Sequence, residues 1–113
     1  MIYADYDYYE GTFYGSAVPR TDFLRLSRQA SAYLDQVTFG RLDAYWAADV
    51  RVQDACCAVV EELYAQAQGG ELVSAANDGY SETYAASGKT PEQRLQMAAA
   101  RYLVMTGLLY QGV

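Results

Sequence analysis

Apolar residues recur every three or four positions along three stretches of the chain, at about residues 19–40, 49–68 and 90–107. This spacing places apolar side chains on one face of an α-helix, whereas a half-buried strand would alternate apolar and polar residues. The residues expected on the buried faces are Phe23, Leu26, Ala30, Tyr33, Leu34, Val37, Val52, Ala55, Cys56, Val59, Leu63, Leu95, Ala98, Ala99, Tyr102, Leu103 and Thr106. The pattern predicts a mostly α fold, a small helical bundle of three longer helices in a single domain that spans residues 1–113.

Residues that start and stop helices stand at the ends of these stretches. Pro19 suits a first helical turn, and Gly40 and the Gly69-Gly70 pair are typical of helix ends. The run Thr90-Pro91-Glu92-Gln93 has the pattern of a capping box with proline at the first helical position. These signals agree with the periodicity and fix the approximate limits of the three longer helices.

A polar segment, Glu71 to Ser87, separates the second and third of these helices. At its centre, Asn77-Asp78-Gly79 contains the residues that tolerate left-handed backbone angles, which predicts a tight reversal. After the reversal, hydroxyl residues alternate with Tyr80, Glu82 and Tyr84, which is the period of an extended strand. We therefore expect an extended arm or β-hairpin inserted before the last helix and used to contact a partner. The other interpretation is an ordinary connecting loop.

The two ends of the chain carry further apolar and aromatic residues. Asp5 can cap a short helix that ends near Gly11 or Gly15, and residues 41–47 can form one or two further turns. The aromatic residues of the first fifteen positions form either a lid over the core or a contact surface: Tyr3, Tyr6, Tyr8, Tyr9, Phe13 and Tyr14. The apolar tail Leu108-Leu109-Tyr110 is expected to dock on its own core or on a neighbour.

Composition limits the classes of function. The 113 residues include 14 acidic and 8 basic ones, for a net charge of −6, and the sequence contains a single lysine. Direct binding to nucleic acid is not expected, because such binding draws its affinity from Lys and Arg side chains that neutralise phosphates. No apolar run approaches the roughly 20 residues of a membrane span. We expect no membrane association.

Candidate chemistry is sparse. The chain has no histidine, so it lacks the commonest general base and the commonest zinc ligand. Its glycines match no phosphate-binding loop. The adjacent Cys56 and Cys57 diverge around a helix, which fits two free thiols in a reducing compartment better than a disulfide. Cys56 is expected in the core and Cys57 at the edge of the buried face. We therefore expect no enzyme activity, no cofactor and no metal.

Runs of residues spread over nearly the whole chain form a recognisable combination. They are Tyr3-Ala4-Asp5-Tyr6-Asp7-Tyr8-Tyr9, Phe13-Tyr14-Gly15, Asp22-Phe23, Ala30-Ser31-Ala32-Tyr33-Leu34-Asp35, Thr38-Phe39-Gly40-Arg41, Val52-Gln53-Asp54-Ala55-Cys56-Cys57-Ala58, Glu61, Ser74 with Asn77-Asp78-Gly79-Tyr80-Ser81, Glu92-Gln93-Arg94-Leu95, and Thr106-Gly107-Leu108-Leu109-Tyr110-Gln111-Gly112-Val113. With these runs the chain resembles the small head–tail connector proteins (head-completion adaptors) of long-tailed bacteriophages and of prophages in Gram-positive bacteria.

The resemblance implies a structural protein of the virion neck that is present in the host cytoplasm before assembly. Such proteins form a ring beneath the portal protein, extend the channel through which DNA passes, and offer a platform to a downstream neck or tail-completion protein. The expected partners are therefore the portal, other copies of the chain and the next neck component, without specific nucleic-acid binding. The expected contact residues are Ser74, Asn77, Asp78, Gly79, Tyr80, Ser81, Glu82, Tyr84, Leu108, Leu109 and Tyr110.

Two other hypotheses remain at this stage. The first is a cytoplasmic helical interaction or regulatory protein, unrelated to virions, that dimerises through the face from Ala98 to Leu109. The second is a different neck or tail-completion component. A dimeric regulator would show a small fixed stoichiometry and no affinity for a portal.

Overall fold

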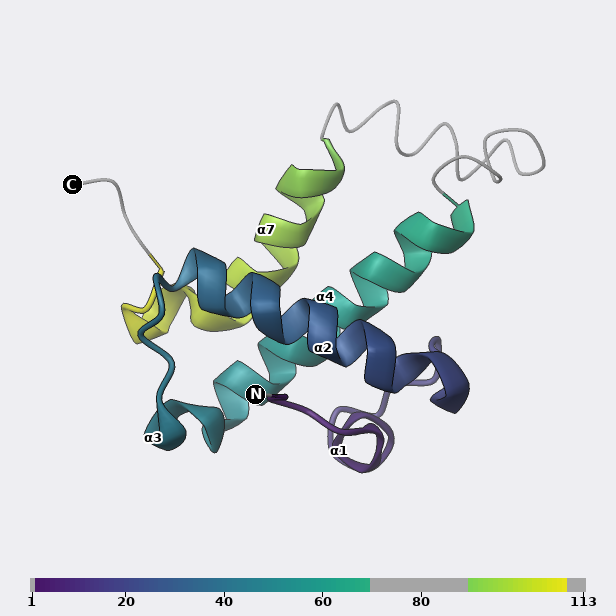
Figure 1. The fold of residues 1–113 in the computed structure, drawn as a ribbon, viewed down its shortest axis with the longest axis horizontal. Helices are drawn as coiled ribbons and strands as arrows, with labels where there is room; N and C mark the ends of the chain where they lie inside the picture. Colours follow the sequence, from purple (N-terminus) through teal and green to yellow (C-terminus); the bar gives the residue numbers. More distant parts are fainter. Residues whose placement is uncertain (1, 70–89, 110–113) are drawn as a thin grey trace.

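The computed structural model describes residues 2–69 and 90–109, and within these ranges the chain is mostly α-helical and contains no β-strand. The elements are α1 (Tyr6–Gly11), α2 (Arg20–Val37), α3 (Ala44–Ala47), α4 (Val50–Gly69), α7 (Pro91–Leu103) and the short 3₁₀ helix η1 (Val104–Thr106). The prediction of a small helical bundle with three longer helices and several short ones is confirmed (Figure 1). The expected arm or hairpin falls in residues 70–89, outside the described residues.

Helix α4 lies at the centre of the structure, where it contacts both α2 and α7 (Figure 1). Because α4 is covered by two helices, its buried face is wider than a single apolar stripe. Cys57 and Val60 are completely buried next to Cys56 and Val59. The prediction that Cys57 lies at the edge of the buried face is therefore wrong. The N-terminal segment accounts for the difference, because Asp5 and Tyr8 lie near Cys57 and Tyr8 donates to Asp54 on the same side of α4.

Local side-chain chemistry starts the first and last helices as predicted. At α1, the Oδ1 atom of Asp5 accepts a hydrogen bond from the Tyr8 amide at 2.8 Å. At α7, Thr90 Oγ1 accepts from the Gln93 amide at 3.1 Å, and Gln93 Oε1 accepts from the Thr90 amide at 2.9 Å. This reciprocal pair is a complete capping box, which satisfies two backbone donors that a helix start leaves without helical partners.

Helix α2 ends three residues before the predicted Gly40. Its last residue is Val37, and the Thr38 hydroxyl donates to the Leu34 carbonyl at 2.7 Å. Phe39 and Gly40 then both adopt left-handed backbone angles, with φ of 58° and 73°. The reversal therefore starts at an aromatic residue, although glycine is the usual choice for this conformation.

The N-terminal segment closes over the bundle through two buried serines of α2. Ser31 Oγ accepts from the Tyr3 amide at 3.0 Å, and the Ser27 hydroxyl donates to the Ala4 carbonyl at 2.6 Å. Both hydroxyls also lie near Cys56 Sγ, at 3.6 and 3.7 Å. The structure thus favours the lid interpretation for this segment, because its backbone groups are hydrogen-bonded inside the core.

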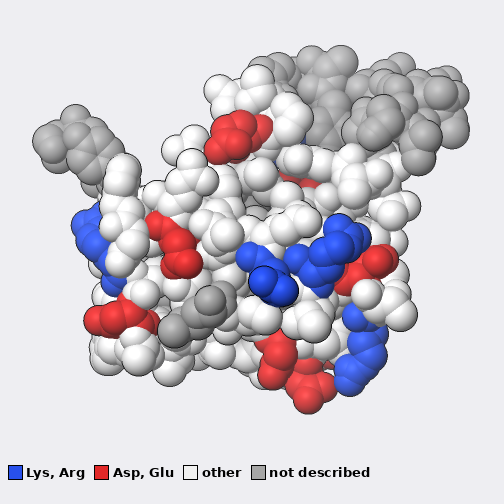
Figure 2. Space-filling model, in the orientation of Figure 1, with Lys and Arg blue, Asp and Glu red and all other residues white. Residues whose placement is uncertain are grey.

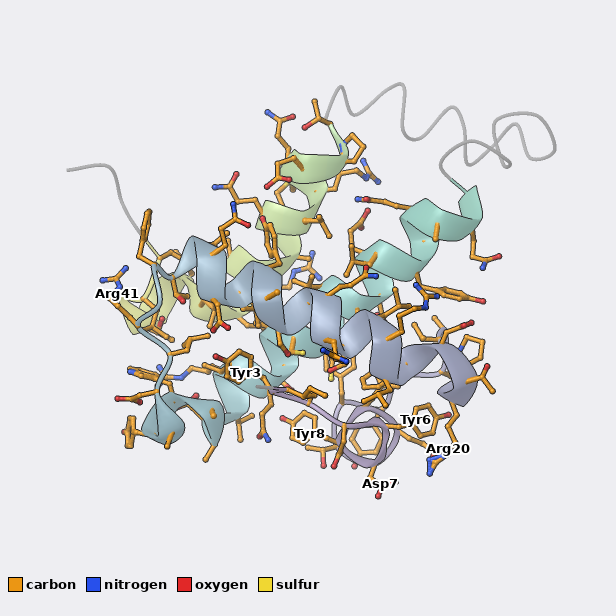
Figure 3. The ribbon with its side chains drawn as sticks, in the orientation of Figure 1. Tyr3, Tyr6, Asp7, Tyr8, Arg20 and Arg41 are labelled. Carbon is orange, nitrogen blue, oxygen red and sulfur yellow. The ribbon has the colours of Figure 1, made fainter. Side chains whose placement is uncertain are left out.

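Charged side chains distinguish the faces of the molecule. Arg20, Arg25 and Arg28 are exposed on α2, and Figure 2 shows basic side chains gathered over this helix. Figure 3 places Asp7 and Arg20 near α1, and Arg41 at the other end of α2. Arg20 lies over the ring of Tyr6, 4.7 Å from its centroid, and its Nη2 atom is 3.7 Å from Asp7 Oδ1.

Candidate interaction site

The predicted contact residues fall in two groups. Ser74, Asn77, Asp78, Gly79, Tyr80, Ser81, Glu82, Tyr84 and Tyr110 lie outside the described residues. Leu108 is described and is only 5% exposed, and Leu109 packs half-buried against the core. A guanidinium nitrogen of Arg41 donates to the Leu108 carbonyl, which ties this part of the tail to the end of α2. The first residues of the apolar tail therefore pack on their own core.

The open ends of α4 and α7 are joined by a small polar cluster, which we call the clasp: Glu62, Gln66, Pro91 and Arg94. The Nε2 atom of Gln66 donates to the Pro91 carbonyl at 3.0 Å and to Glu62 Oε2 at 2.9 Å. Arg94 Nε lies 3.5 Å from the same carboxylate oxygen, and the side chains of Glu62 and Arg94 are 20% and 19% exposed. The clasp therefore joins the last turns of α4 to the first turn of α7.

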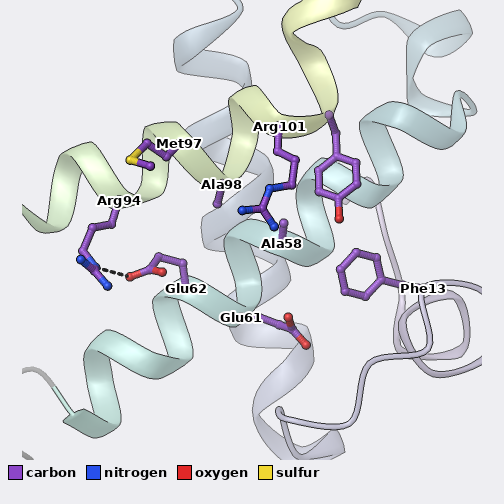
Figure 4. Close-up of a pocket in the computed structure, with 9 residues that line it drawn as sticks. Phe13, Ala58, Glu61, Glu62, Arg94, Met97, Ala98 and Arg101 are labelled. Atoms are coloured by element: carbon purple, nitrogen blue, oxygen red, sulfur yellow. Dashed lines mark ion pairs between the residues drawn. The ribbon is translucent and has the colours of Figure 1, made fainter. Parts of the chain in front are cut away.

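A groove runs beside the clasp between α4 and α7, with a volume of about 480 Å³ (Figure 4). We call it the α4–α7 groove. It is lined by Phe13, Ala58, Glu61, Glu62, Arg94, Met97, Ala98, Arg101 and Tyr102. Two guanidinium groups and two carboxylates face each other here, so the lining has no net charge.

The carboxylates of this groove have structural partners. Glu62 belongs to the clasp, and Glu61 accepts a hydrogen bond from the Tyr9 hydroxyl at 2.8 Å. Neither forms the closely paired acid and base that general acid–base catalysis requires. Arg101 is exposed and points into the groove beside the rings of Phe13 and Tyr102. This arrangement suits a carboxylate or aromatic side chain of a partner protein.

Three tyrosines of the N-terminal segment are fastened to carboxylates of the long helices. Tyr3 donates to Asp35 on α2, Tyr8 donates to Asp54 on α4 at 2.8 Å, and Tyr9 donates to Glu61. Burial, and then the hydrogen bond to the carboxylate, raises the pKa of Tyr3 and of Tyr8 above the ordinary tyrosine value.

Tyr9 is the most deeply placed of the three. Burial and then its bond to Glu61 raise its pKa to about 12. Its hydroxyl also accepts hydrogen bonds from the amides of Ala17 and Val18, at 2.9 and 3.1 Å. The N-terminal tyrosines therefore hold the lid in place.

The two cysteines are buried and unpaired. Burial raises the pKa of both thiols, so the nucleophilic thiolate is disfavoured at neutral pH. Among residues 2–69 and 90–109, no group of three acidic, cysteine or histidine side chains is arranged to hold a metal ion. Within the same residues, no helix has the length and apolar character that crossing a lipid bilayer requires.

Sequence reasoning missed a second set of surface residues. Phe39, Met97, Val104 and Met105 are large apolar side chains, and each is more than half exposed. The only signal in the sequence is that they fall outside the predicted buried stripes. They lie at the end of α2 and along α7 and η1.

Comparison of the chain with known protein families, with curated proteins and with solved structures finds no match.

Proposed function

We propose that this protein is a structural component of a bacteriophage neck, a head–tail connector that forms a ring beneath the portal and joins the DNA-filled head to the tail. The sequence resemblance supports this proposal over nearly the whole chain. The helical bundle, with three longer helices, is compatible with it. In this role the protein resides in the host cytoplasm before assembly and in the virion neck afterwards.

One structural observation carries the proposal, namely the clasp. The Gln66 Nε2 atom donates a hydrogen bond to the Pro91 carbonyl at 3.0 Å, although the two residues are 25 positions apart in the sequence. This bond links α4 to α7. The residues that precede and follow the segment from 70 to 89 are therefore fixed relative to one another. A contact element on a fixed base loses less freedom on binding than one on a loose base, which favours assembly. The proposed partners of this element are the portal and neighbouring copies.

The acidic balance fits passage of DNA. A channel lined with like charge does not retain the duplex, and the chain carries a net charge of −6. The acidic residues between positions 70 and 89, namely Glu71, Asp78 and Glu82, contribute to this charge and are the ones we propose to test. Their replacement by Gln or Asn should slow DNA ejection, whereas unchanged DNA retention and ejection would contradict this assignment.

Electron microscopy of particles from an induced lysogen that lacks the gene tests the function directly. Separate accumulation of DNA-filled heads and of tails is expected, because the joining component is missing. Intact infectious particles would contradict the connector function.

Complementation of that lysogen then tests the contact element. A chain without residues 74–84 should remain a folded helical domain and fail to restore joined particles, whereas the full chain restores them. Loss of cooperative unfolding in the shortened chain would show that these residues belong to the core.

The clasp is tested separately by Gln66→Ala, with Gln29→Ala on the exposed face of α2 as its matched control. Because Gln66 bridges α4 and α7, its loss should reduce the yield of joined particles while the helix content stays unchanged. Equal yields from the two variants would show that the fixed base does not matter.

A dimeric helical regulator is the second candidate, favoured by the exposed apolar residues Val104 and Met105. The two candidates differ in stoichiometry. A regulator forms a closed dimer in solution and does not bind a portal, whereas a connector gives larger rings or binds to portal-containing heads. Sedimentation of the purified chain alone and with such heads separates them. A different neck or tail-completion component would bind the neck without contacting the portal itself.

A further inference from the structure

Two exposed aromatic residues occupy left-handed backbone positions. Within residues 2–69 and 90–109, Tyr14 and Phe39 are the only non-glycine residues with positive φ, at 63° and 58°. Their side chains are 83% and 64% exposed. A bulky side chain in this region strains the backbone, and a glycine would relieve the strain. Strain of this kind is concentrated at contact and functional sites.

Tyr14 is held in place by the residues on either side of it. The amide of Phe13 donates to the Tyr8 carbonyl at 2.9 Å, and the amide of Gly15 donates to the Tyr9 carbonyl at 2.8 Å. The turn is thus anchored to α1, while the Tyr14 ring extends into solvent. A rigidly presented aromatic ring provides contact area at a low cost in conformational entropy.

A groove of about 610 Å³ lies at the other end of α2, between its last turn and α7; we call it the α2–α7 groove. Its lining residues are Gln36, Val37, Phe39, Gln96, Met97, Ala99, Ala100, Val104 and Leu109. None of these nine carries a charge. The volume falls within the roughly 300–1,000 Å³ of ordinary binding clefts. Phe39, the second strained aromatic, forms part of its wall.

The tyrosine and the groove cannot meet within one copy of the chain. Tyr14 precedes α2 and the groove follows it, and α2 has 18 residues, a length of about 27 Å. Figure 1 shows α1 near one end of α2 and the C-terminal turns of α7 near the other end. A contact between them therefore joins two copies head to tail.

The exposed charges nearest to the two features differ in sign. Asp7 and Glu10 are exposed on α1, next to the turn that carries Tyr14, and Arg20 lies 3.7 Å from Asp7. Arg41 is exposed two residues after Phe39, which forms part of the groove wall. An approach that brings Glu10 towards Arg41 favours this orientation over the reverse.

We infer that the α2–α7 groove receives Tyr14 of a second copy of this chain. Such a contact uses different surfaces on the two copies, so its repetition builds a closed ring or an open chain. The contact between subunits does not depend on the connector function, and only the closure of these contacts into a ring rests on that proposed function. The α4–α7 groove suits the role less well, because two carboxylates and two arginines already face each other there.

Cross-linking between two single-cysteine additions tests the contact. Full-length chains that carry Tyr14→Cys and Met97→Cys are mixed and treated with a short bismaleimide, while Cys56 and Cys57 are shielded by burial. The matched control replaces Tyr14→Cys with Leu24→Cys, whose site on α2 is 60% exposed. Several-fold more cross-linked dimer is expected from the Tyr14 mixture than from the control. Equal yields, or dimers formed mainly within one variant alone, would overturn the inference.

Sedimentation velocity of further variants gives a second measurement. Tyr14→Gly removes the ring and also relieves the backbone strain, so the fold is retained while self-association weakens. Glu10→Arg should also weaken association, because it removes the acidic charge next to the turn that carries Tyr14. Unchanged association in Tyr14→Gly would overturn the inference.

The outcomes for the contact and for the connector function are separable. Specific Tyr14–Met97 cross-linking together with intact particles from the deleted lysogen would leave the contact standing and remove the connector function. Separate heads and tails without specific cross-linking would leave the connector function standing and remove the contact.

Discussion

The ring of Tyr9 lies directly against Gly15, so that a Cβ atom added to Gly15 would come within 2.1 Å of Tyr9 Cε1. Tyr9 is completely buried and its ring packs on Phe23 with centroids 4.8 Å apart, so the ring has no room to move away. Gly15→Ala should therefore destabilise the protein by about 2 kcal/mol or more, as overpacking does. The midpoint of urea unfolding, followed by circular dichroism, measures this loss.

Gly11 provides the matched control, because a Cβ atom there meets nothing within 4 Å and its backbone is not left-handed. Gly11→Ala should leave stability unchanged or raise it by about 0.4–1 kcal/mol, since alanine has fewer unfolded conformations. Equal unfolding midpoints for the two variants would contradict the contact between Tyr9 and Gly15.

The Tyr9 hydroxyl links the lid to α4 and predicts a dependence of stability on alkaline pH. Tyr9→Phe removes a donor to Glu61 and an acceptor for the Ala17 and Val18 amides, which should cost about 1–3 kcal/mol at neutral pH. The exposed ring of Tyr45 offers a control, and Tyr45→Phe should change stability by less than about 0.5 kcal/mol.

The sign of the pH effect follows from the raised pKa of Tyr9. Its folded pKa is about 12, above the ordinary tyrosine value of 10.0, so the unfolded chain loses this proton first as pH rises. The contribution of Tyr9 to stability is therefore complete below pH 10 and is lost between pH 10 and about 12. Over that range the unfolding free energies of the natural chain and Tyr9→Phe should converge. A difference in unfolding free energy that stays constant from pH 10 to 12 would contradict the raised pKa of Tyr9.

Local chemistry made part of the fold predictable from the sequence. The start of α7 depends on Thr90, Pro91 and Gln93, which lie within four residues, so the capping box could be recognised without any knowledge of the fold. The same holds for Asp5 at the start of α1. The burial of Cys57 was not predictable in this way, because it depends on the N-terminal segment folding back over α4 from a distant part of the sequence.

The candidate site was less predictable, because its parts are distant in sequence or break local preferences. Gln66 and Pro91 meet across 25 residues, and no pattern pairs them. Tyr14 and Phe39 stand where glycine or asparagine is usual, so residue preference gave no warning of a left-handed backbone. The predicted contact residues from Ser74 to Tyr84 lie outside the described residues and stay a prediction.

The capping box of α7 should contribute measurably to stability. Thr90→Ala removes the acceptor for the Gln93 amide and should cost about 1 kcal/mol, while Thr90→Ser keeps an acceptor and most of the stability. Urea unfolding of the three proteins measures the difference. Identical midpoints for the alanine and serine variants would show that the side-chain oxygen is not responsible.

Cys56 and Cys57 should be protected from alkylation in the folded protein. Both are completely buried, and burial raises the pKa of both thiols, so reaction requires opening of the structure. At any moment a fraction of about 10⁻³ or less of the molecules of a stable protein is unfolded. Iodoacetamide should therefore react with the cysteines at least about a thousandfold more slowly in the native protein than in urea. Mass spectrometry of both peptides over time measures the rates. Fast modification of either cysteine in the native protein would show that α4 is accessible where α2 and the N-terminal segment cover it.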